Sequence, residues 1–422
     1  MANFILVGKN GFNLPRDLEV PSVLSGHSSL LTPQLIDFLL KRGHEVSLVC
    51  PRSAGRSDQI YEAGPYAPNQ LRVFPYGDTK FAKTPQSVPL DAFVAAMGAA
   101  FGAGSCSHMK TTVISIYGFP FAPMVECLRP AFNFSHLVLL RGGDGDRWLS
   151  SNMLQSEYTN FNEADTIVKW YVSALTNADA IFTASEWLAT RARSHDIAIT
   201  SVIPTPPPDL DPTQAVEFGK HVLSKIAKEN SLVVEGKKIL LFAGRDSPEK
   251  RPDLALRAFA EWQDENWVLL MLGIPAPQQG DVSLPKGKNV GFSTVSPFHF
   301  AALAHVSHGF IHTSLKLNGF EDARPSAVSI AASAGCSVVF PKNVGGVSEC
   351  VSGLNQEMFG FDVVHDSVDE TTDGIVRSLR NLNCSDKTER VRASNMSHYD
   401  NLKPDIIFEE LTKHVSKSIE MV

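Results

Sequence analysis

The sequence predicts an α/β fold built from two parallel-sheet domains. At 422 residues the chain exceeds what one ordinary hydrophobic core organises, and it suits two domains of about 200 residues each. Apolar runs of strand length alternate with amphipathic helical segments in both halves, and this order builds parallel sheets. Three successive prolines, residues 206–208, predict a stiff connector between the halves, because proline continues neither a helix nor a central strand.

The composition is that of a soluble globular protein, with 43% hydrophobic and 20% charged residues. The net charge of −7 disfavours nucleic acid as a partner, because a phosphate-binding surface normally has an excess of Lys and Arg. The six cysteines form no CxxC pair and no zinc-type spacing with histidine. The amino terminus has no signal-peptide pattern, and no apolar stretch reaches membrane-spanning length. We therefore expect a cytoplasmic protein without a transmembrane segment.

The first half opens with a βαβ unit. Residues 3–8 and 43–50 are typical of buried strands, and residues 32–42 between them are typical of a helix. A later apolar run, residues 137–140, ends in the segment Arg141-Gly-Gly-Asp-Gly-Asp146. A cluster this rich in glycine and aspartate exceeds what a solvent-exposed turn requires, so we expect it to have a functional role.

The second half contains a strand, a glycine turn, two cations and a helix start within one short segment. Residues 238–243 predict a strand, and residues 253–262 predict an amphipathic helix. Gly244 allows a tight turn, and Arg245 and Lys250 lie on the loop at the carboxyl end of the strand, where open α/β sheets bind ligands. A guanidinium and an ammonium group together neutralise much of a diphosphate. A solvated loop with ordinary surface charges is the alternative interpretation.

A second group of motifs follows downstream. Residues 309–314 predict a short buried strand, Asp322 begins a loop into a small-residue helix that ends at Gly335, and residues 336–340 predict another strand. The glycine turn Val344-Gly-Gly-Val-Ser-Glu349 comes next. In this order and spacing the motifs resemble the carboxy-terminal domain of the retaining nucleotide-sugar glycosyltransferases of family 4. That domain carries a glycine-arginine/lysine loop, an acid-x7-glutamate motif and a closing Gly-Gly-x-x-Glu turn.

The resemblance implies the GT-B fold, in which two Rossmann-like domains face each other across a cleft. It implies a hexosyltransferase-type enzyme that moves a sugar from a nucleoside-diphosphate donor to an acceptor with retention of the anomeric configuration. The donor is expected to be a UDP-sugar or GDP-sugar, the acceptor an unidentified small molecule or glycan, and neither a metal nor another cofactor is expected. The domains are expected at residues 1–207 and 208–394, with a helix over residues 395–422 that returns to the first domain.

The resemblance places the donor site in the second domain. Asp322 takes the first position of the acid-x7-glutamate motif, where the acid contacts the donor sugar, and it is the main catalytic candidate. Arg245 and Lys250 are expected to contact the diphosphate, so that replacing either leaves the stability nearly unchanged. The expected donor-binding residues are Gly244, Arg245, Lys250, Gly273, Thr294, Val295, Ser314, Arg324 and Ser326. For Arg324 an ion pair with Glu321 or Asp322 is an equal alternative.

The second acid of the motif clamps the ribose in relatives, and its position falls on Ile330. Isoleucine accepts no hydrogen bond, and the lost contact is worth on the order of 1–3 kcal/mol of donor affinity. A register shifted by one residue would place Glu321 and Ser329 in the motif, but Asp322 fits the small-residue helix better. Two alternatives stay open: a catalytically altered or inactive protein that binds sugar or nucleotide, and a phosphorylase-like GT-B enzyme.

Four residues of the first half complete the expected site. Gly26 and His27 occupy the place of the family's amino-terminal glycine loop, although one glycine remains where two are usual. His27 and Asp144 are expected to assist catalysis, and Gly26 and Arg141 to face the acceptor. For His27 a structural turn histidine is an equal alternative. The segment Asp144-Gly-Asp146 resembles a metal-binding motif, but its place in the first domain speaks against that role.

Overall fold

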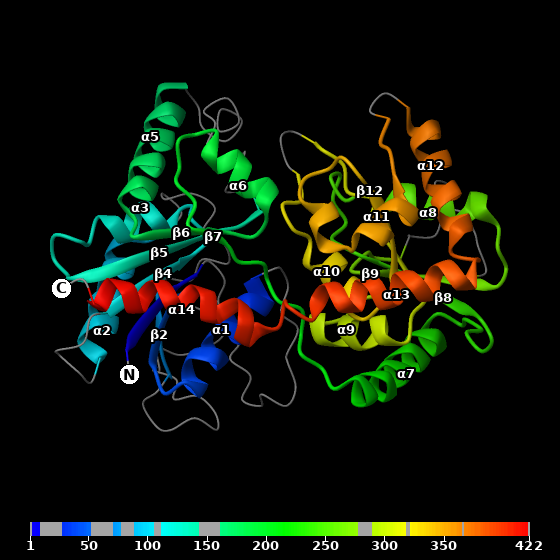
Figure 1. The fold of residues 1–422 in the computed structure, drawn as a ribbon, viewed down its shortest axis with the longest axis horizontal. Helices are drawn as coiled ribbons and strands as arrows, with labels where there is room; N and C mark the ends of the chain where they lie inside the picture. Colours follow the sequence, from blue (N-terminus) through cyan, green and yellow to red (C-terminus); the bar gives the residue numbers. More distant parts are fainter. Residues whose placement is uncertain are drawn as a thin grey trace. The chain divides into compact units, whose positions relative to one another are not determined.

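Two compact units make up the chain. The computed structural model describes residues 2–8, 28–51, 71–76, 88–104, 111–142, 161–276, 289–317, 321–364 and 367–420. One unit comprises Met1–Thr205 together with Pro404–Val422, and the other comprises Pro206–Lys403. Each unit has its own parallel sheet (Figure 1). The α/β architecture with two Rossmann-like domains is thereby confirmed.

The first unit is built on a seven-stranded sheet with the order β3-β2-β1-β4-β5-β6-β7, in which every described pair of strands is parallel. The strands are β1 (Asn3–Val7), β2 (Glu45–Cys50), β3 (Leu71–Pro75), β4 (Thr111–Ile116), β5 (Phe134–Leu140), β6 (Ala180–Thr183) and β7 (Ser201–Val202). The strands predicted over residues 3–8 and 43–50 are confirmed as β1 and β2. The order of the strands reverses between β1 and β4, which defines the topological switch point of this sheet.

Six described helices belong to the first unit. They are α1 (Ser28–Lys41), α2 (Leu90–Ala103), α3 (Phe121–Glu126), α5 (Phe161–Asn177), α6 (Glu186–Arg193) and α14 (Pro404–Glu420). The predicted helix over residues 32–42 is α1, which begins four residues earlier. Ser185 caps α6 in the expected way, since its hydroxyl accepts a hydrogen bond from the backbone N–H of Leu188 at 3.2 Å.

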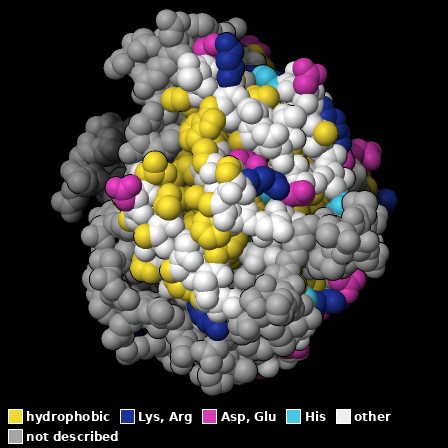
Figure 2. Space-filling model, turned by 90° about the vertical axis from the view of Figure 1, so that its left-hand side faces the viewer, with side chains coloured by type: hydrophobic (Ala, Val, Ile, Leu, Met, Phe, Trp, Pro, Cys, Tyr) yellow, Lys and Arg dark blue, Asp and Glu magenta, His cyan; other side chains and the backbone are white. Residues whose placement is uncertain are grey.

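Helix α2 is apolar on both its buried and its exposed side. Phe93 is fully buried in a cluster with Tyr76 and Phe121, and the rings of Phe93 and Tyr76 meet edge to face with centroids 5.5 Å apart. Leu90 and Val94 of the same helix are exposed. Figure 2, which views the molecule from the left-hand side of Figure 1, shows a band of hydrophobic side chains on that side. A helix with apolar residues all round has no clear helical periodicity, so its sequence gave no prediction of a helix here.

The carboxy-terminal helix α14 packs on the first unit. Its Phe408 is buried and lies against Phe38 of α1 with ring centroids 5.5 Å apart, and Glu409 forms an ion pair with Arg42 at 2.6 Å. Figure 1 shows α14 beside α1. The amphipathic pattern of this segment therefore reflects a buried stripe against α1 and an exposed polar face.

The second unit is built on a six-stranded sheet with the order β10-β9-β8-β11-β12-β13, and its described pairs are also parallel. The strands are β8 (Lys238–Ala243), β9 (Trp267–Leu272), β10 (Val290–Ser293), β11 (Gly309–Ile311), β12 (Ser337–Pro341) and β13 (Gly360–Phe361). The run predicted over residues 238–243 coincides with β8. The switch point of this sheet lies between β8 and β11.

The helices of the second unit surround this sheet. The described helices are α7 (Pro212–Glu229), α8 (Pro252–Trp262), α9 (Pro297–His305), α10 (Ser326–Ser333), α11 (Gly353–Phe359), α12 (Val368–Asn381) and α13 (Ser385–Tyr399), with a 3-10 helix η3 at Val347–Cys350. The core holds Trp262 of α8 against Trp267 of β9, with ring centroids 5.2 Å apart. Among the described residues, no helix has both the length and the apolar character that crossing a bilayer requires.

The structure divides the chain at different residues from those predicted. The first boundary falls between Thr205 and Pro206, two residues before the predicted one. The second falls after Lys403, so the boundary predicted at residue 394 is wrong because it cuts through α13. Asn395 of α13 is fully buried in the second unit, where it donates to the Cys336 carbonyl at 2.9 Å and accepts from the Ser352 N–H at 3.0 Å. Burial of these hydrogen bonds ties α13 to the second unit.

We expect Phe408→Ala to lower the free energy of unfolding of the first unit by about 3–5 kcal/mol, because it removes a buried ring from the contact between α14 and α1. Ile406→Ala is the matched control on the same helix, since Ile406 is 50% exposed. Urea denaturation followed by circular dichroism measures both variants. Equal stability of the two variants would contradict the packing of α14 described above.

Candidate functional site

The polar residues predicted to bind the donor in the second unit lie at one edge of its sheet. The loop after β8 carries Arg245 and Lys250, and the strand β11 is followed by His312, Thr313 and Ser314. Because β8 and β11 are adjacent and parallel, their carboxyl ends lie side by side at the switch point. This is the position at which open α/β sheets bind ligands.

A buried ion pair links two loops at this edge. The ammonium group of Lys250 lies 2.7 Å from Oδ1 and 2.5 Å from Oδ2 of Asp322. The side chains of Lys250 and Asp322 are only 9% and 4% exposed. The two residues are 72 positions apart in the sequence, so the pair fixes the loop after β8 against the loop that enters α10.

His312 is the third member of this buried group. Its Nε2 lies 3.2 Å from Oδ2 of Asp322. Burial lowers the pKa of His312 below its ordinary value, and the nearby charge of Lys250 acts in the same direction, although the Asp322 carboxylate opposes both. His312 is therefore neutral at neutral pH, and the group of three carries one positive and one negative charge.

Asp322 is ionised throughout the physiological pH range. Burial by itself would raise the pKa of its carboxyl group, but the charge of Lys250 and the hydrogen bond with His312 hold the pKa well below its usual range. The ionised state of the Asp322 carboxyl group thus depends on Lys250 and His312. In turn, it keeps the ammonium group of Lys250 at a fixed position near the end of β8.

The backbone around Lys250 is held by the loop that follows β11. The Thr313 hydroxyl lies 2.9 Å from the Lys250 carbonyl and 2.8 Å from the Arg251 carbonyl, and the Leu315 N–H donates to the Glu249 carbonyl at 2.9 Å. Arg251 adopts a left-handed conformation with φ of 46° immediately before α8. A non-glycine residue in this region is uncommon, and here the contact with Thr313 on the loop after β11 holds it there.

The Gly-Gly turn fixes the loop that carries Asp322. Gly345 has φ of +55°, and a Cβ atom at this position would collide with the Asp322 carbonyl. The Gly346 N–H donates to that carbonyl at 2.9 Å, and the Gly345 N–H donates to Oε2 of Glu321 at 2.8 Å. Glu321 also forms an ion pair with Lys316 at 2.9 Å. The turn is therefore a backbone support for Asp322, which explains its need for glycine.

Two other glycines bring the ends of β8 and β9 together. Gly273 has φ of +84°, and a Cβ atom there would collide with the Gly244 carbonyl. The Gly244 N–H donates to the Leu272 carbonyl at 3.1 Å, and the Gly273 N–H donates to the Ser293 carbonyl at 2.8 Å. Thr294, which is exposed, and Val295 follow β10 directly. The predicted glycines, Thr294 and Val295 thus lie at the ends of three adjacent strands.

The two predicted loop cations differ in their surroundings. The side chain of Arg245 is 73% exposed and forms only a solvent-accessible ion pair with Glu249 at 3.2 Å. Lys250 is buried against Asp322, so the expectation that its removal leaves stability unchanged is wrong. Removing Lys250 would leave a buried carboxylate without its partner, and such a loss is strongly destabilising.

Ser314 and Arg324 contribute buried polar atoms. The Ser314 hydroxyl and the Nε of Arg324 are both buried and make no hydrogen bond within the described part of the chain. Neither ion pair weighed for Arg324 is present: its guanidinium is hydrogen-bonded to Tyr399 and lies near Cys350 and Glu349. Ser326 is the first residue of α10. Ser314 and Arg324 are thus available for a ligand at the loops after β11 and before α10.

The predicted residues of the first unit fall into two groups. Gly26, His27 and Asp144 lie outside the described residues. Arg141 follows β5, is 7% exposed and donates from Nη1 to the Thr205 hydroxyl at 3.2 Å. Its role toward an acceptor stays a prediction.

Ile330 lies inside α10 and is 3% exposed. Ser329, the alternative from the shifted register, is buried as well. The side chain that replaces the second motif acid is therefore part of an apolar core.

Sequence reasoning missed His312. The only signal was its position as a polar residue directly after the buried run Gly309 to Ile311, at the carboxyl end of a predicted parallel strand. The contact of His312 with Asp322 is not detectable from local sequence.

Comparisons with solved structures identify the fold. A sucrose-phosphate synthase from Thermosynechococcus elongatus superposes with a TM-score of 0.67 at 16% sequence identity, covering 99% of this chain and 100% of that chain. This chain has the GT-B fold. HepE from Anabaena in complex with UDP-glucose gives a TM-score of 0.61 at 13% identity over 100% of both chains. The glycosyltransferase WaaG gives a TM-score of 0.61 at 12% sequence identity, and the alignment covers 97% of this chain and 98% of that chain. No protein-family model matches the sequence, and no curated protein matches it.

We expect Lys250→Met to lower the free energy of unfolding of the second unit by about 3–5 kcal/mol, because it leaves the Asp322 carboxylate buried without a counter-charge. The double variant Lys250→Met/Asp322→Leu should recover part of this loss, since it removes both charges. Arg245→Ala is the control and should stay within about 0.5 kcal/mol of the parent because its ion pair is exposed. A Lys250→Met protein as stable as the parent would refute the structural role of the pair.

The depressed pKa of His312 predicts a loss of stability in mild acid. The unfolded chain binds a proton at this imidazole below its ordinary pKa of 6.5, whereas the folded protein resists protonation until a lower pH. The free energy of unfolding therefore falls as the pH falls below 6.5, by at most about 1.4 kcal/mol per pH unit for this one group. Urea denaturation at pH 7.0 and 5.5 measures the difference. It should shrink in His312→Gln and stay unchanged in His221→Gln, an exposed control on α7.

Ile330→Glu should destabilise the second unit by more than about 3 kcal/mol, because the new carboxylate would be buried in α10 without a partner. Ile330→Met is the matched control, and it should cost less than about 1.5 kcal/mol because the volume is nearly conserved. Thermal melting compares the variants. If the Ile330→Glu variant has the same melting temperature as the parent, the side chain at this position reaches solvent or a ligand instead.

Proposed function

We propose that this protein is a hexosyltransferase-type enzyme that transfers a sugar from a nucleoside-diphosphate donor to an acceptor with retention of the anomeric configuration. UDP-sugars and GDP-sugars are the proposed donors, and a small molecule or glycan is the proposed acceptor. The observation that carries the proposal is the convergence of three loops at the switch point of the second sheet. These are the loop of Arg245 and Lys250, the loop of Asp322, and the turn of Gly345 and Gly346.

The proposed donor site holds its diphosphate at the ends of β8 and β11. Arg245 is exposed and can leave Glu249 for a phosphate at little cost, because surface ion pairs contribute less than about 1 kcal/mol. The ammonium group of Lys250 is already fixed in place by Asp322, so it requires no reorganisation when charge develops on the leaving group. The buried Ser314 hydroxyl and Arg324 Nε supply further donors for phosphate oxygens.

Two glycines at the ends of β8 and β9 support the position that we propose for the nucleobase. Gly273 lets the ends of β8 and β9 approach closely, and neither Gly244 nor Gly273 adds a side chain at this edge of the sheet. Thr294 and Val295 border this position beyond β10. We assign the nucleobase to this region, where backbone groups recognise it.

The reaction needs stabilisation of the diphosphate that leaves the sugar. In the proposed mechanism the cations Arg245 and Lys250 supply this stabilisation, and no metal ion or other cofactor takes part. Asp322 positions Lys250, and the remaining lone pairs of its carboxylate can accept a hydrogen bond from a hydroxyl group of the donor sugar. In the first unit, Arg141, His27, Gly26 and Asp144 are the proposed acceptor-side and catalytic residues.

Binding without turnover is the second candidate function, and the burial of Ile330 favours it. The side chain that occupies the motif position of the ribose-clamping acid is 3% exposed and apolar. A protein with this site could hold a nucleotide sugar and leave it intact. Incubation with UDP-glucose and GDP-mannose separates the two functions: release of UDP or GDP, with the anomeric configuration of the product read by NMR, supports the transferase. Calorimetric binding with no nucleotide release supports the binding protein.

We expect Arg245→Ala to weaken UDP or GDP binding by about 1–3 kcal/mol, because a charged hydrogen-bond donor to the diphosphate is lost. Arg257→Ala is the matched control, since Arg257 lies on α8 in exposed ion pairs with Glu261 and Asp369. Isothermal titration calorimetry measures both variants. Unchanged affinity in Arg245→Ala, or equal loss in both variants, would argue against the proposed diphosphate site.

A further inference from the structure

The loop that joins β8 to α8 pairs each of its three cations with a carboxylate. The pairs are Arg245 with Glu249, Lys250 with Asp322 and Arg251 with Asp253. The cations differ in exposure: the side chain of Arg245 is 73% exposed, whereas those of Arg251 and Lys250 are 25% and 9% exposed. An anion that approaches this loop from solvent therefore reaches Arg245 most readily, and it finds this guanidinium paired with Glu249.

Glu249 is the more firmly held member of its pair. Its side chain is 17% exposed, and its backbone carbonyl accepts a hydrogen bond from the Leu315 N–H at 2.9 Å. The next residue, Lys250, is fixed by its buried contact with Asp322. Arg245 makes no second ion pair with the part of the chain that the structure describes. The guanidinium of Arg245 can thus turn toward a ligand, while the carboxylate of Glu249 stays close to it.

The Glu249 carboxylate occupies a hydrogen-bond donor that a phosphate would use. Nη2 of Arg245 donates to Oε1 of Glu249 at 3.2 Å. Carboxylate and phosphate oxygens accept hydrogen bonds from a guanidinium in the same way, so the two groups compete for this donor. A phosphate that displaces Glu249 also lies near the negative charge of the carboxylate, which repels it. Both effects lower the affinity of this loop for an anion.

We propose that Glu249 is an intramolecular competitor of the donor diphosphate for Arg245. This inference rests on the function proposed above, because it requires a diphosphate at the loop of Arg245. The carboxylate of Glu249 holds the guanidinium until a diphosphate displaces it, so Glu249 sets the nucleotide affinity of the site below the value that Arg245 alone would give. Surface ion pairs are weak, and the expected effect is therefore a few-fold change in affinity.

Calorimetric titration of Glu249→Gln with UDP and with GDP tests the competition. Glutamine has nearly the same size as glutamate but no charge, so it releases Arg245 without leaving a gap. We expect the variant to bind the nucleotide that the parent binds at least about threefold more tightly. Its melting temperature should stay close to that of the parent, because a single surface ion pair contributes little to stability.

Two further variants separate competition from a general effect of charge. Asp246→Asn serves as the control, because Asp246 is an exposed carboxylate next to Arg245 and forms no ion pair with a described residue. It should change the nucleotide affinity by less than about twofold, since salt screens exposed charges. The double variant Arg245→Ala/Glu249→Gln should bind as weakly as Arg245→Ala, because the guanidinium that Glu249 withholds is no longer present.

Three results would overturn the inference. The first is an unchanged affinity in Glu249→Gln, and the second is an equal gain in Asp246→Asn, which would reduce the effect to overall charge. The third is a gain from Glu249→Gln that persists without Arg245. If Arg245→Ala weakens UDP or GDP binding while Glu249→Gln leaves it unchanged, the competition is wrong and the proposed function stands. A parent protein that binds neither nucleotide contradicts the proposed function and this inference together.

Discussion

The buried ion pair between Lys250 and Asp322 is the interaction on which the candidate site depends. Two charges that are almost fully removed from solvent persist only with close geometry and additional hydrogen bonds. Here the geometry is supplied by three backbone supports. Thr313 holds the carbonyls of Lys250 and Arg251, Gly346 holds the carbonyl of Asp322, and Gly345 holds the side chain of Glu321. The position of the loops is thus a consequence of one electrostatic contact and the glycine turn that permits it.

This pair also determines which charges are free to meet a ligand. Lys250 is neutralised by Asp322, and His312 is neutral, so the buried centre adds no net charge to the end of β8. Arg245 is the exposed cation of the same loop. In the proposed donor site a diphosphate would therefore meet the exposed guanidinium of Arg245 and the ammonium group of Lys250, which needs no reorganisation because Asp322 already holds it.

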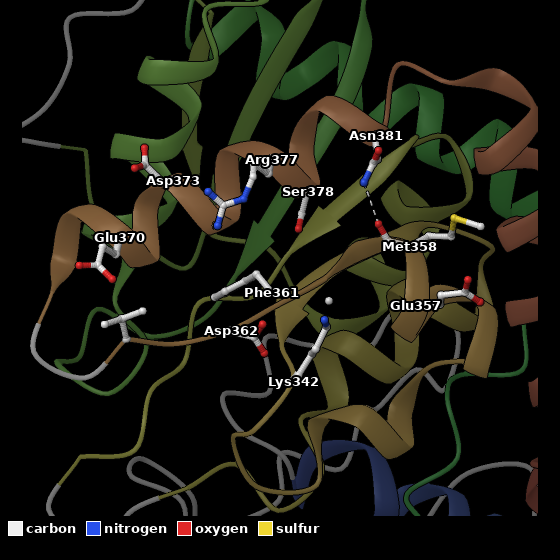
Figure 3. Close-up of a pocket in the computed structure, with 13 residues that line it drawn as sticks. Lys342, Glu357, Met358, Phe361, Asp362, Glu370, Asp373, Arg377, Ser378 and Asn381 are labelled. Atoms are coloured by element: carbon white, nitrogen blue, oxygen red, sulfur yellow. Dashed lines mark hydrogen bonds between the residues drawn. The ribbon is translucent and has the colours of Figure 1, made fainter.

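Charged side chains also lie at the carboxyl edge of the second sheet away from the switch point. Lys342, which follows β12 and lines a cavity of about 440 Å³ (Figure 3), is three residues before Gly345 of the turn that supports Asp322. In parallel sheets every strand ends at the same edge, and polar residues after successive strands therefore accumulate there. The two positions differ in their electrostatics: the charge of Lys250 is balanced by one buried carboxylate, whereas the cavity that Lys342 and Arg377 line has four carboxylates, those of Glu357, Asp362, Glu370 and Asp373, and is negative overall.

The sequence by itself determined the elements whose signal is local. The apolar run of β8 and the amphipathic helix α8 follow from hydrophobic periodicity, and the glycines at positions 273 and 345 follow from backbone conformations that glycine adopts most readily. Helix α2 escaped prediction because it is apolar on both sides, and β13 because it has only two residues. The tertiary structure alone decided that Lys250 is a buried partner of Asp322, that His312 joins them, and that Lys342 and Arg377 face one cavity. The physical reason is that burial and charge pairing depend on residues distant in sequence, which only the order of the strands brings together.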